Sequence, residues 1–237
     1  LSRLFREIGA FDQAGQALDS AEAVYTGSRI QHRGLRAEIR LERTKVAIGR
    51  GDHAHALADL RAAQVELGAD APPRMRAHLL RTQADALRSL GQYQDALLAY
   101  QQAEAGFASI QASLDELDTY VAAGETLLQL GNRERAHARF VAATDLARRT
   151  GSLRQLTRVL TLRGVAAGEV PALREAAQIA ERLGDPLQRG EALLAMAQLV
   201  ANRTNAGAGG APVLAEEEAD RALDTVLALA GDRFVDL

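Results

Sequence analysis

The chain contains 237 residues, of which 47% are hydrophobic and 25% charged, as in most folded globular proteins. Its formal net charge of -3, from 28 basic and 31 acidic side chains, argues against a protein whose overall field attracts nucleic acid or an anionic membrane. Cysteine and tryptophan are absent and aromatic residues make up 4%, which excludes disulfides and zinc-thiolate sites and favours closely packed helices.

A glycine-centred pattern repeats along the chain: glycine, a small residue five positions later, a larger apolar residue at nine and alanine at twelve. The four complete copies are Gly9/Ala14/Leu18/Ala21, Gly51/Ala56/Leu60/Ala63, Gly91/Ala96/Tyr100/Ala103 and Gly131/Ala136/Phe140/Ala143. Successive glycines are 42, 40 and 40 residues apart. Because these offsets fall on one face of a helix, each copy predicts a turn followed by a helix.

A second helical run precedes each glycine, for example at residues 75–90 and 114–130, so the repeating unit is predicted to be a helix-turn-helix hairpin. Small alanines allow the two helices to approach closely, and the larger residue fills the space between them. The predicted hairpins cover approximately residues 1–28, 29–70, 71–110, 111–150, 151–184 and 185–231 of a single domain, 1–237.

Helix starts are predicted at prolines and at one capping sequence. Pro73, Pro171 and Pro186 lie where helices should begin, because proline is accepted in the first turn. Ser113 is followed three residues later by Glu116, which matches the capping-box pattern and predicts Ser113 as an N-cap.

The last two hairpins depart from the pattern. After Gly168 the large and small positions are exchanged, with Leu173 at five and Ala177 at nine. In the sixth hairpin, residues 204–212 are expected to form a flexible insert, after which a second helix should resume near Ala215. The chain starts without methionine, inside a run of residues with helical character, so we expect it to be part of a longer protein. We expect that protein to be cytoplasmic.

Residues 90–103, with the sequence LGQYQDALLAYQQA, closely resemble the turn and second helix of a tetratricopeptide repeat. Residues 130–143 (LGNRERAHARFVAA) repeat this stretch with Arg133 in place of the usual aromatic residue, and residues 48–57 (IGRGDHAHAL) are a looser copy. The resemblance extends over nearly the whole chain. Units of about 40 residues, rather than about 34, are similar to the longer repeats of bacterial multidomain regulators and to those that precede caspase-like CHAT proteases.

This resemblance implies an all-α, right-handed α-solenoid of about six hairpins, whose first helices line a concave groove that binds a protein or peptide partner. In this family the groove-facing positions lie 13, 10, 6 and 3 residues before the turn glycine. Counted from Gly91 and Gly131, the partner-binding residues are predicted to be His78, Arg81, Asp85, Arg88, Asp118, Val121, Glu125 and Leu128. The third hairpin would then present mainly positive charge and the fourth mainly negative charge.

Two charged surfaces also have a purely structural explanation. The polar positions of the third hairpin could bind a carboxylate-bearing peptide through arginine, or could be a solvated face with Arg–Asp pairs within the helix. Arginines with 4-3-4-3 spacing form a basic ridge, which could dock an acidic partner or could simply be solvated. A phosphate backbone is a less favoured partner, because no aromatic residues for base stacking lie between the arginines. The ridge consists of Arg29, Arg33, Arg36, Arg40 and Arg43.

The sequence predicts no catalytic, metal or cofactor site. His53 and His55 are two residues apart on a helix and therefore point in different directions, and the glycine-rich residues 207–211 lack the Lys-Ser/Thr of a phosphate-binding loop. We therefore predict a non-catalytic scaffold module of a bacterial regulatory protein, which binds protein or peptide partners and could self-associate through its ends. The alternative is an effector-binding receptor domain, for a small molecule or signalling peptide, in a signal-transduction regulator or protease.

Overall fold

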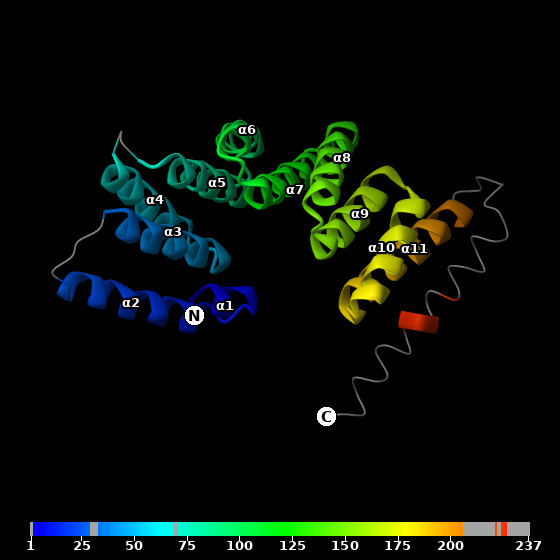
Figure 1. Cartoon of the computed structure of the whole chain (residues 1–237), viewed down its shortest axis with the longest axis horizontal. Coiled ribbons are helices and arrows are strands. Elements are labelled where there is room, and N and C mark those ends of the chain that lie inside the picture. The colour runs from blue at the N-terminus through cyan, green and yellow to red at the C-terminus, as the bar shows by residue number, and fades with distance from the viewer. Residues whose placement is uncertain (1, 29–32, 69–70, 206–220, 222–223, 227–237) are drawn as a thin grey trace, which may run out of the picture. The chain divides into compact units, whose positions relative to one another are not determined.

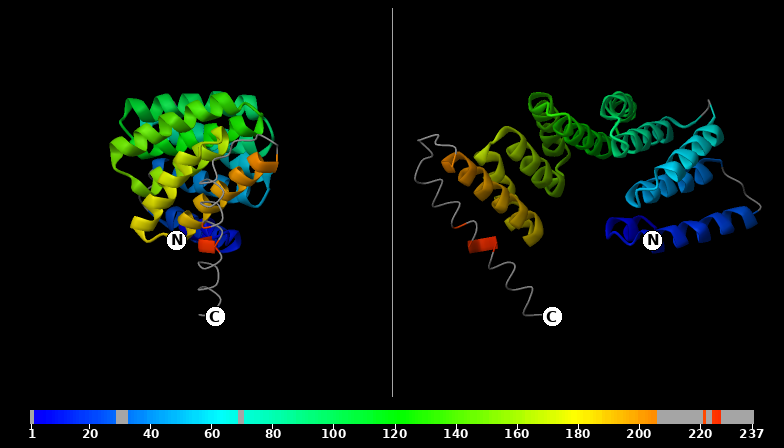
Figure 2. Two further views of the ribbon diagram at one scale, coloured as in Figure 1. Left: turned by 90° about the vertical axis from the view of Figure 1, so that its right-hand side faces the viewer. Right: turned by 180° about the vertical axis from the view of Figure 1, so that it is seen from behind.

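The structure is a computed structural model that describes residues 2–28, 33–68, 71–205, 221 and 224–226. The regular elements of these ranges are helices, which confirms the predicted all-α class (Figures 1 and 2). The chain divides into two compact units, unit 1 (Leu1–Leu130) and unit 2 (Gly131–Leu237). The division lies in the turn at Gly131, within the fourth predicted hairpin, and each unit is described by itself.

The helices of unit 1 follow one another as hairpins joined by short turns. They are α1 (Ser2–Glu7), α2 (Phe11–Gly27), α3 (Arg33–Gly49), α4 (His53–Leu67), α5 (Pro73–Ser89), α6 (Tyr93–Ser109) and α7 (Ser113–Gln129). Within hairpins α3 packs on α4 and α5 on α6, while α2 contacts α3 and α6 contacts α7 between hairpins. The first helices also contact one another in the order α1, α3, α5 and α7, so they form one row.

Unit 2 contains α8 (Arg133–Thr150), α9 (Leu153–Ala167), α10 (Val170–Leu183) and α11 (Pro186–Asn205). α9 packs on α8, α10 and α11, and α10 packs on α11. From residue 206 on, the predicted insert 204–212 lies outside the described residues, and so does Ala215, where a second helix is expected to resume.

The glycines at the turns within the hairpins adopt a left-handed conformation. Gly9, Gly51, Gly91, Gly131 and Gly168 have φ angles between 71° and 75°. Glycine reaches this region without the steric cost that a Cβ imposes, so a helix can end there and the chain can reverse. In each case the next helix begins two residues later, which confirms the predicted turns.

The small and large positions of the repeat are buried. The alanines five residues after the glycines, Ala14, Ala56, Ala96 and Ala136, are at most 1% exposed. Tyr100 and Phe140, at the large position, are fully buried. Burying a large side chain of this kind stabilises a fold by about 1.5–3 kcal/mol, so these positions contribute to the packing of the unit in which each lies.

The exchanged positions of the fifth hairpin are compensated on its first helix. Leu173 is fully buried where the other copies have alanine. Opposite it lies Gly164, four residues before the turn glycine, where the third and fourth hairpins have Leu87 and Leu127. A Cβ at Gly164 would lie 2.6 Å from Cγ of Leu173, so only glycine leaves room for the larger side chain. The large residue has therefore moved from one helix of the pair to the other.

The predicted helix starts are correct at the prolines and wrong at Ser113. α5 begins at Pro73, α11 begins at Pro186, and Pro171 lies in the first turn of α10. At α7 the N-cap is Ala112, and Ser113 is the first helical residue. Glu116 does not complete a capping box, because its Oε1 accepts a hydrogen bond of 3.0 Å from the hydroxyl of Tyr120.

Candidate functional site

The predicted groove residues lie on α5 and α7, which are neighbours in unit 1. The positive residues of α5 face the negative residues of α7 directly. Nη1 of Arg81 lies 3.7 Å from Oδ2 of Asp118. Nη1 of Arg88 lies 3.2 Å from Oε2 of Glu125. The opposite charges of the third and fourth hairpins thus pair with each other across the row of first helices.

Two residues outside the predicted set extend this arrangement. Nη2 of Arg74 lies 3.0 Å and Nε2 of His78 lies 3.7 Å from Oδ2 of Asp115. We call the whole set the α5–α7 ladder, which consists of Arg74, His78, Arg81, Arg88, Asp115, Asp118 and Glu125. Arg74, Arg81 and Arg88 are seven residues apart and so share a helix face, a spacing from which Arg74 could have been predicted.

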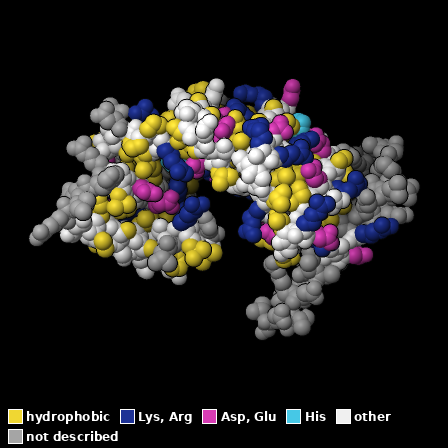
Figure 3. Space-filling model, in the orientation of Figure 1, with side chains coloured by type: hydrophobic (Ala, Val, Ile, Leu, Met, Phe, Trp, Pro, Cys, Tyr) yellow, Lys and Arg dark blue, Asp and Glu magenta, His cyan; other side chains and the backbone are white. Residues whose placement is uncertain are grey.

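The ladder is a partly exposed surface. Apart from Arg74, whose side chain is 68% exposed, its side chains are 21–36% exposed. Ion pairs at this exposure are screened by water and contribute about 0–1 kcal/mol each. Figure 3 shows basic and acidic side chains next to one another on the visible face of unit 1. The ladder can therefore exchange its internal pairs for contacts with another molecule at small cost.

The remaining predicted groove residues have packing roles. The hydroxyl of Tyr100 donates a hydrogen bond of 2.5 Å to Oδ1 of Asp85, which joins α6 to α5. Burial and the Asp85 carboxylate both raise the pKa of the Tyr100 hydroxyl. Val121 is only 2% exposed and belongs to the core, and Leu128 is half-buried. Of the eight predicted residues, the charged ones other than Asp85 form the open surface.

His78 occupies a half-buried position within the ladder. Its ring meets the ring of Phe107 edge to face, with 4.9 Å between centroids and an interplanar angle of 70°. Burial lowers the pKa of His78, and the positive charges of Lys45, Arg74 and Arg81 act in the same direction. The carboxylate of Asp115 opposes this shift. His78 therefore favours its neutral form in the folded protein more than a free histidine does.

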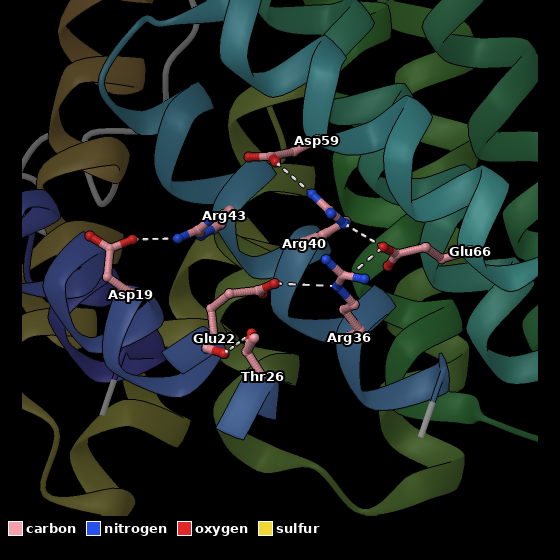
Figure 4. A network of polar contacts seen from close by, with 8 residues as sticks. All are labelled: Asp19, Glu22, Thr26, Arg36, Arg40, Arg43, Asp59 and Glu66. Carbon is pink, nitrogen blue, oxygen red and sulfur yellow. Dashed lines mark hydrogen bonds and ion pairs between the residues drawn. The ribbon is translucent and has the colours of Figure 1, made fainter. Parts of the chain in front are cut away.

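The predicted basic ridge lies between carboxylates of α2 and α4 wherever its side chains are described. Arg29 lies outside the described residues, and Arg33 belongs to α3 without a described side chain. Figure 4 shows the other three, Arg36, Arg40 and Arg43, among Asp19 and Glu22 of α2 and Asp59 and Glu66 of α4. An acidic partner would have to displace these carboxylates to reach the arginines.

A cleft of about 540 Å³ opens between α2, α3 and α4 in unit 1. Its charged lining comprises Asp12 and Asp19 of α2, Arg43 of α3, Arg50 directly after α3, Asp52 at the N-cap of α4, and His55 and Asp59 of α4. Neither the family offsets nor the arginine spacing predicted this cleft, because it depends on how three helices pack together.

The first turn of α4, which contains His53 and His55, forms local hydrogen bonds with its N-cap Asp52. Oδ1 of Asp52 accepts a hydrogen bond of 3.2 Å from the backbone amide of His55, and this bond is the largest cause that lowers the pKa of Asp52. Its Oδ2 lies 2.6 Å from Nδ1 of His55. The described part of the chain contains no group of three His, Cys, Asp or Glu residues that could hold a metal ion. None of the described helices combines the length and apolar character that crossing a membrane requires.

Unit 2 has its own charged cluster around Glu169, in the turn between α9 and α10. Oε1 of Glu169 lies 3.0 Å from Nε2 of His137 on α8, and Oε2 lies 2.8 Å from Nη2 of Arg163 on α9. A single carboxylate thus joins three segments of the unit. We interpret these contacts as stabilising the packing of unit 2. None of these residues was predicted as a site.

Solved structures with the same fold exist, although no family model matches the chain and no curated protein is similar to it. BtubC (BKLC) from P. vanneervenii has a TM-score of 0.73 and 16% identity, over 94% of this chain and 90% of that chain. The apo form of RapI has a TM-score of 0.69 and 12% identity, over 92% of this chain and 61% of its own length.

A third similar structure is PH0952 from Pyrococcus horikoshii, a signal transduction ATPase with a tetratricopeptide repeat sensor. It has a TM-score of 0.69 and 16% identity, and the match covers 100% of this chain and 36% of that chain. The chain therefore spans about a third of PH0952 and about three fifths of RapI. At these identities the matches show the fold, which is a TPR-like array of paired helices.

Proposed function

We propose that this chain is a non-catalytic module that binds a protein or peptide segment, and that the α5–α7 ladder is its contact surface. The observation that carries the proposal is the ladder itself, in which opposite charges from two neighbouring helices pair at 3.0–3.7 Å while remaining partly exposed. Charged and polar groups of a partner can substitute for these pairs, because each is worth little on its own.

The length of the ladder fits a short peptide segment. Arg74 and Arg88 are 14 residues apart on α5, which corresponds to about 21 Å at about 1.5 Å of rise per residue. An extended peptide covers that distance with roughly six residues at about 3.3 Å each. A segment of this length could contact each pair of the ladder in turn.

The proposal is tested with a phage-displayed library of random dodecapeptides selected on the wild-type chain. We expect the enriched peptides to bind with at least tenfold lower affinity to a variant that carries Arg81→Glu and Arg88→Glu, as measured by fluorescence polarisation. The charge reversal leaves Asp118 and Glu125 facing glutamates, which removes the cationic contacts of the ladder.

The matched control carries Arg61→Glu and Arg154→Glu, which makes the same change in net charge at exposed positions outside the ladder. Circular dichroism should show that both double variants are folded. If the two variants bind the enriched peptides equally well, or if no peptide is enriched on the wild type above the ladder variant, the proposal is wrong.

The alternative function, an effector-binding receptor domain, has two supporting observations. The fold matches a structure whose name includes a tetratricopeptide repeat sensor, and the cleft of about 540 Å³ lies in the usual range of roughly 300–1,000 Å³ for small-molecule sites. A thermal-shift screen with pooled sugars, nucleotides and signalling peptides tests it. A rise in melting temperature with one small metabolite would support the receptor, since a ligand that binds only the folded state stabilises it.

A further inference from the structure

The cleft between α2, α3 and α4 lies on a regular array of charges. Arg36 and Arg43 of α3 and Arg50, which directly follows that helix, are seven residues apart. The same spacing relates Asp52, the N-cap of α4, to Asp59 and Glu66 of that helix. Helical residues seven apart lie on one helix face. We call the following residues the three-helix array: Asp12, Asp19 and Glu22 of α2, Arg36, Arg40 and Arg43 of α3 with the following Arg50, and Asp59 and Glu66 of α4 with its N-cap Asp52.

The arginines of α3 pair with carboxylates on the α2 side. Nη2 of Arg50 lies 2.8 Å from Oδ1 of Asp12, and Arg43 forms a hydrogen bond with Asp19. Nε of Arg36 lies 3.3 Å from Oε1 of Glu22. From Arg50 to Arg43 to Arg36, the residue number of the carboxylate partner on α2 increases while that of the arginine decreases, so the two helices run antiparallel. Each of these arginines meets one carboxylate of α2.

The α4 side is joined mainly by one arginine. Nε of Arg40 lies 3.0 Å from Oε1 of Glu66, and its Nη1 lies 3.6 Å from Oδ1 of Asp59. Nε of Arg36 also lies 3.3 Å from Glu66. Arg36 and Arg40 therefore each share their donors between two carboxylates, as Figure 4 shows.

The array contains more negative than positive groups. Its six carboxylates stand against four guanidinium groups, and the lining of the cleft alone has four aspartates against two arginines. His55, also in the lining, is hydrogen-bonded to Asp52. In the described part of the chain, Oε2 of Glu22 and Oε2 of Glu66 are buried without a hydrogen-bond partner. These two unpaired carboxylate oxygens indicate that the array has too few hydrogen-bond donors for its acceptors.

Among the aspartates that line the cleft, Asp59 has the longest described ion pair. Its side chain is 22% exposed and lines the cleft, and the described contact to its carboxylate is Arg40 at 3.6 Å, beyond normal hydrogen-bond distance. Burial raises the pKa of Asp59 even though Arg43 and Arg40 act to lower it. A further cation in the cleft would stabilise the charged form of Asp59 and satisfy its open oxygens.

We infer that the cleft binds a basic side chain of a partner protein, with Asp59 as the principal carboxylate and with Asp12, Asp19 and Asp52 around it. Arginine suits the site better than lysine, because its planar fork donates hydrogen bonds to two carboxylate oxygens at once. The same arrangement disfavours an acidic partner, for which the arginines of α3 would first have to lose their carboxylates. This site is separate from the α5–α7 ladder.

The inference is tested with fluorescein-labelled hexapeptides in which three arginines, three lysines or three glutamates alternate with glycine. We expect the arginine peptide to bind the wild-type chain more tightly than the lysine peptide, and the glutamate peptide not to bind. Asp59→Asn should weaken binding of the arginine peptide about tenfold. Asp145→Asn, an equal charge change at an exposed position of unit 2, should alter it less than twofold.

The site of binding is located by two-dimensional NMR of the wild-type chain titrated with the arginine peptide. Shifts of amide signals in α2, α3 and α4 support the inference, and shifts confined to α5 and α7 overturn it. Equal binding by Asp59→Asn and Asp145→Asn overturns it as well, and so does spermidine if it competes as strongly as the peptide. Arg81→Glu with Arg88→Glu, which tests the ladder, should leave this binding unchanged, so the two proposals can fail independently.

Discussion

Unit 1 carries two charge arrays made from the same residue types but joined in different ways. In the α5–α7 ladder, basic residues of one helix meet acidic residues of one neighbour. In the three-helix array, arginines of α3 lie between carboxylates of two helices, and Arg36 and Arg40 each serve two of them. An arginine that joins two carboxylates, as Arg36 and Arg40 do, therefore ties the fold together, whereas one that meets a single carboxylate of a neighbouring helix forms an exchangeable surface pair.

The side chains of the Arg40 pairs in the array are also less exposed than those of the Arg81–Asp118 pair in the ladder. Arg40, Asp59 and Glu66 are 19–22% exposed, whereas Arg81 and Asp118 of the ladder are 26% and 35% exposed. Water screens the Arg81–Asp118 pair more strongly than the pairs of Arg40, so breaking it should cost less than removing Arg40 from the array. The comparison leads to the following experiments.

Arg40→Met should have the largest effect on stability. Methionine keeps much of the aliphatic stem but leaves Asp59 and Glu66 without the guanidinium they share, so the free energy of unfolding should fall by about 2 kcal/mol. Urea denaturation followed by circular dichroism measures the change. Arg81→Met in the ladder is the matched control, with an expected loss of about 0.5 kcal/mol. Equal losses would show that the two arrays do not differ.

Tyr100→Phe tests the role of Asp85, the charged predicted groove residue that packs against α6 instead of joining the ladder. The change removes the donor to Asp85 and leaves a half-buried carboxylate without that hydrogen bond. Stability should fall by about 1 kcal/mol in urea denaturation. Tyr93→Phe, on the same helix at a position without a described side-chain hydrogen bond, should change stability by less than about 0.3 kcal/mol. A similar loss in both variants would mean that Asp85 does not depend on Tyr100.

His78 gives the ladder a pH dependence of known sign. Because its pKa in the folded chain lies below the ordinary value of 6.5, the unfolded chain binds more protons as the pH falls through that value. Stability should therefore decrease from pH 7.5 to pH 5.5. In His78→Gln this decrease should be smaller, while His55→Gln, at a side chain that is 80% exposed, should behave as the wild type. An unchanged pH profile in His78→Gln would contradict the assignment.

The features that could be predicted from the sequence are those that depend on local geometry. Turn glycines require φ angles that other residues adopt at a cost, and the alanine and aromatic positions follow from helix periodicity, so both were correct. Gln111 has a φ of 57° without being glycine, and no pattern identified it. The Ser113 capping box failed because the turn places Ala112 at the N-cap instead.

The charge arrays were predictable only in part. The spacing of the α3 arginines was visible, but their partners are 14 to 30 residues away in sequence, from Glu22 to Glu66 for Arg36, and depend on the packing register of α2 and α4. The family offsets located most of the ladder and missed Arg74 and Asp115. Each of these residues lies about one turn nearer the N-terminus of its helix than the first predicted position. Val121 fits the offsets and is nevertheless buried, because α7 is covered at that point.

Asp59→Asn should have the smallest effect on stability among these variants, and the effect should depend on pH. Since burial raises the pKa of Asp59, its negative charge costs stability above that pKa, and the cost fades as the pH falls towards the unfolded value of 3.8. Asparagine removes the charge, so the variant should be as stable as the wild type at pH 7 or more stable by less than about 1 kcal/mol. The difference should shrink when urea denaturation is repeated at acidic pH.

Asp118→Asn in the ladder provides the contrast to this variant. It removes the ion pair with Arg81, and it should lower stability at pH 7 by about 0.5 kcal/mol. Opposite signs for the two aspartates would mean that the array lacks positive charge while the ladder is balanced. If Asp59→Asn instead destabilises the chain as Asp118→Asn does, Asp59 is already satisfied within the fold, and the cleft has no electrostatic reason to bind a basic side chain.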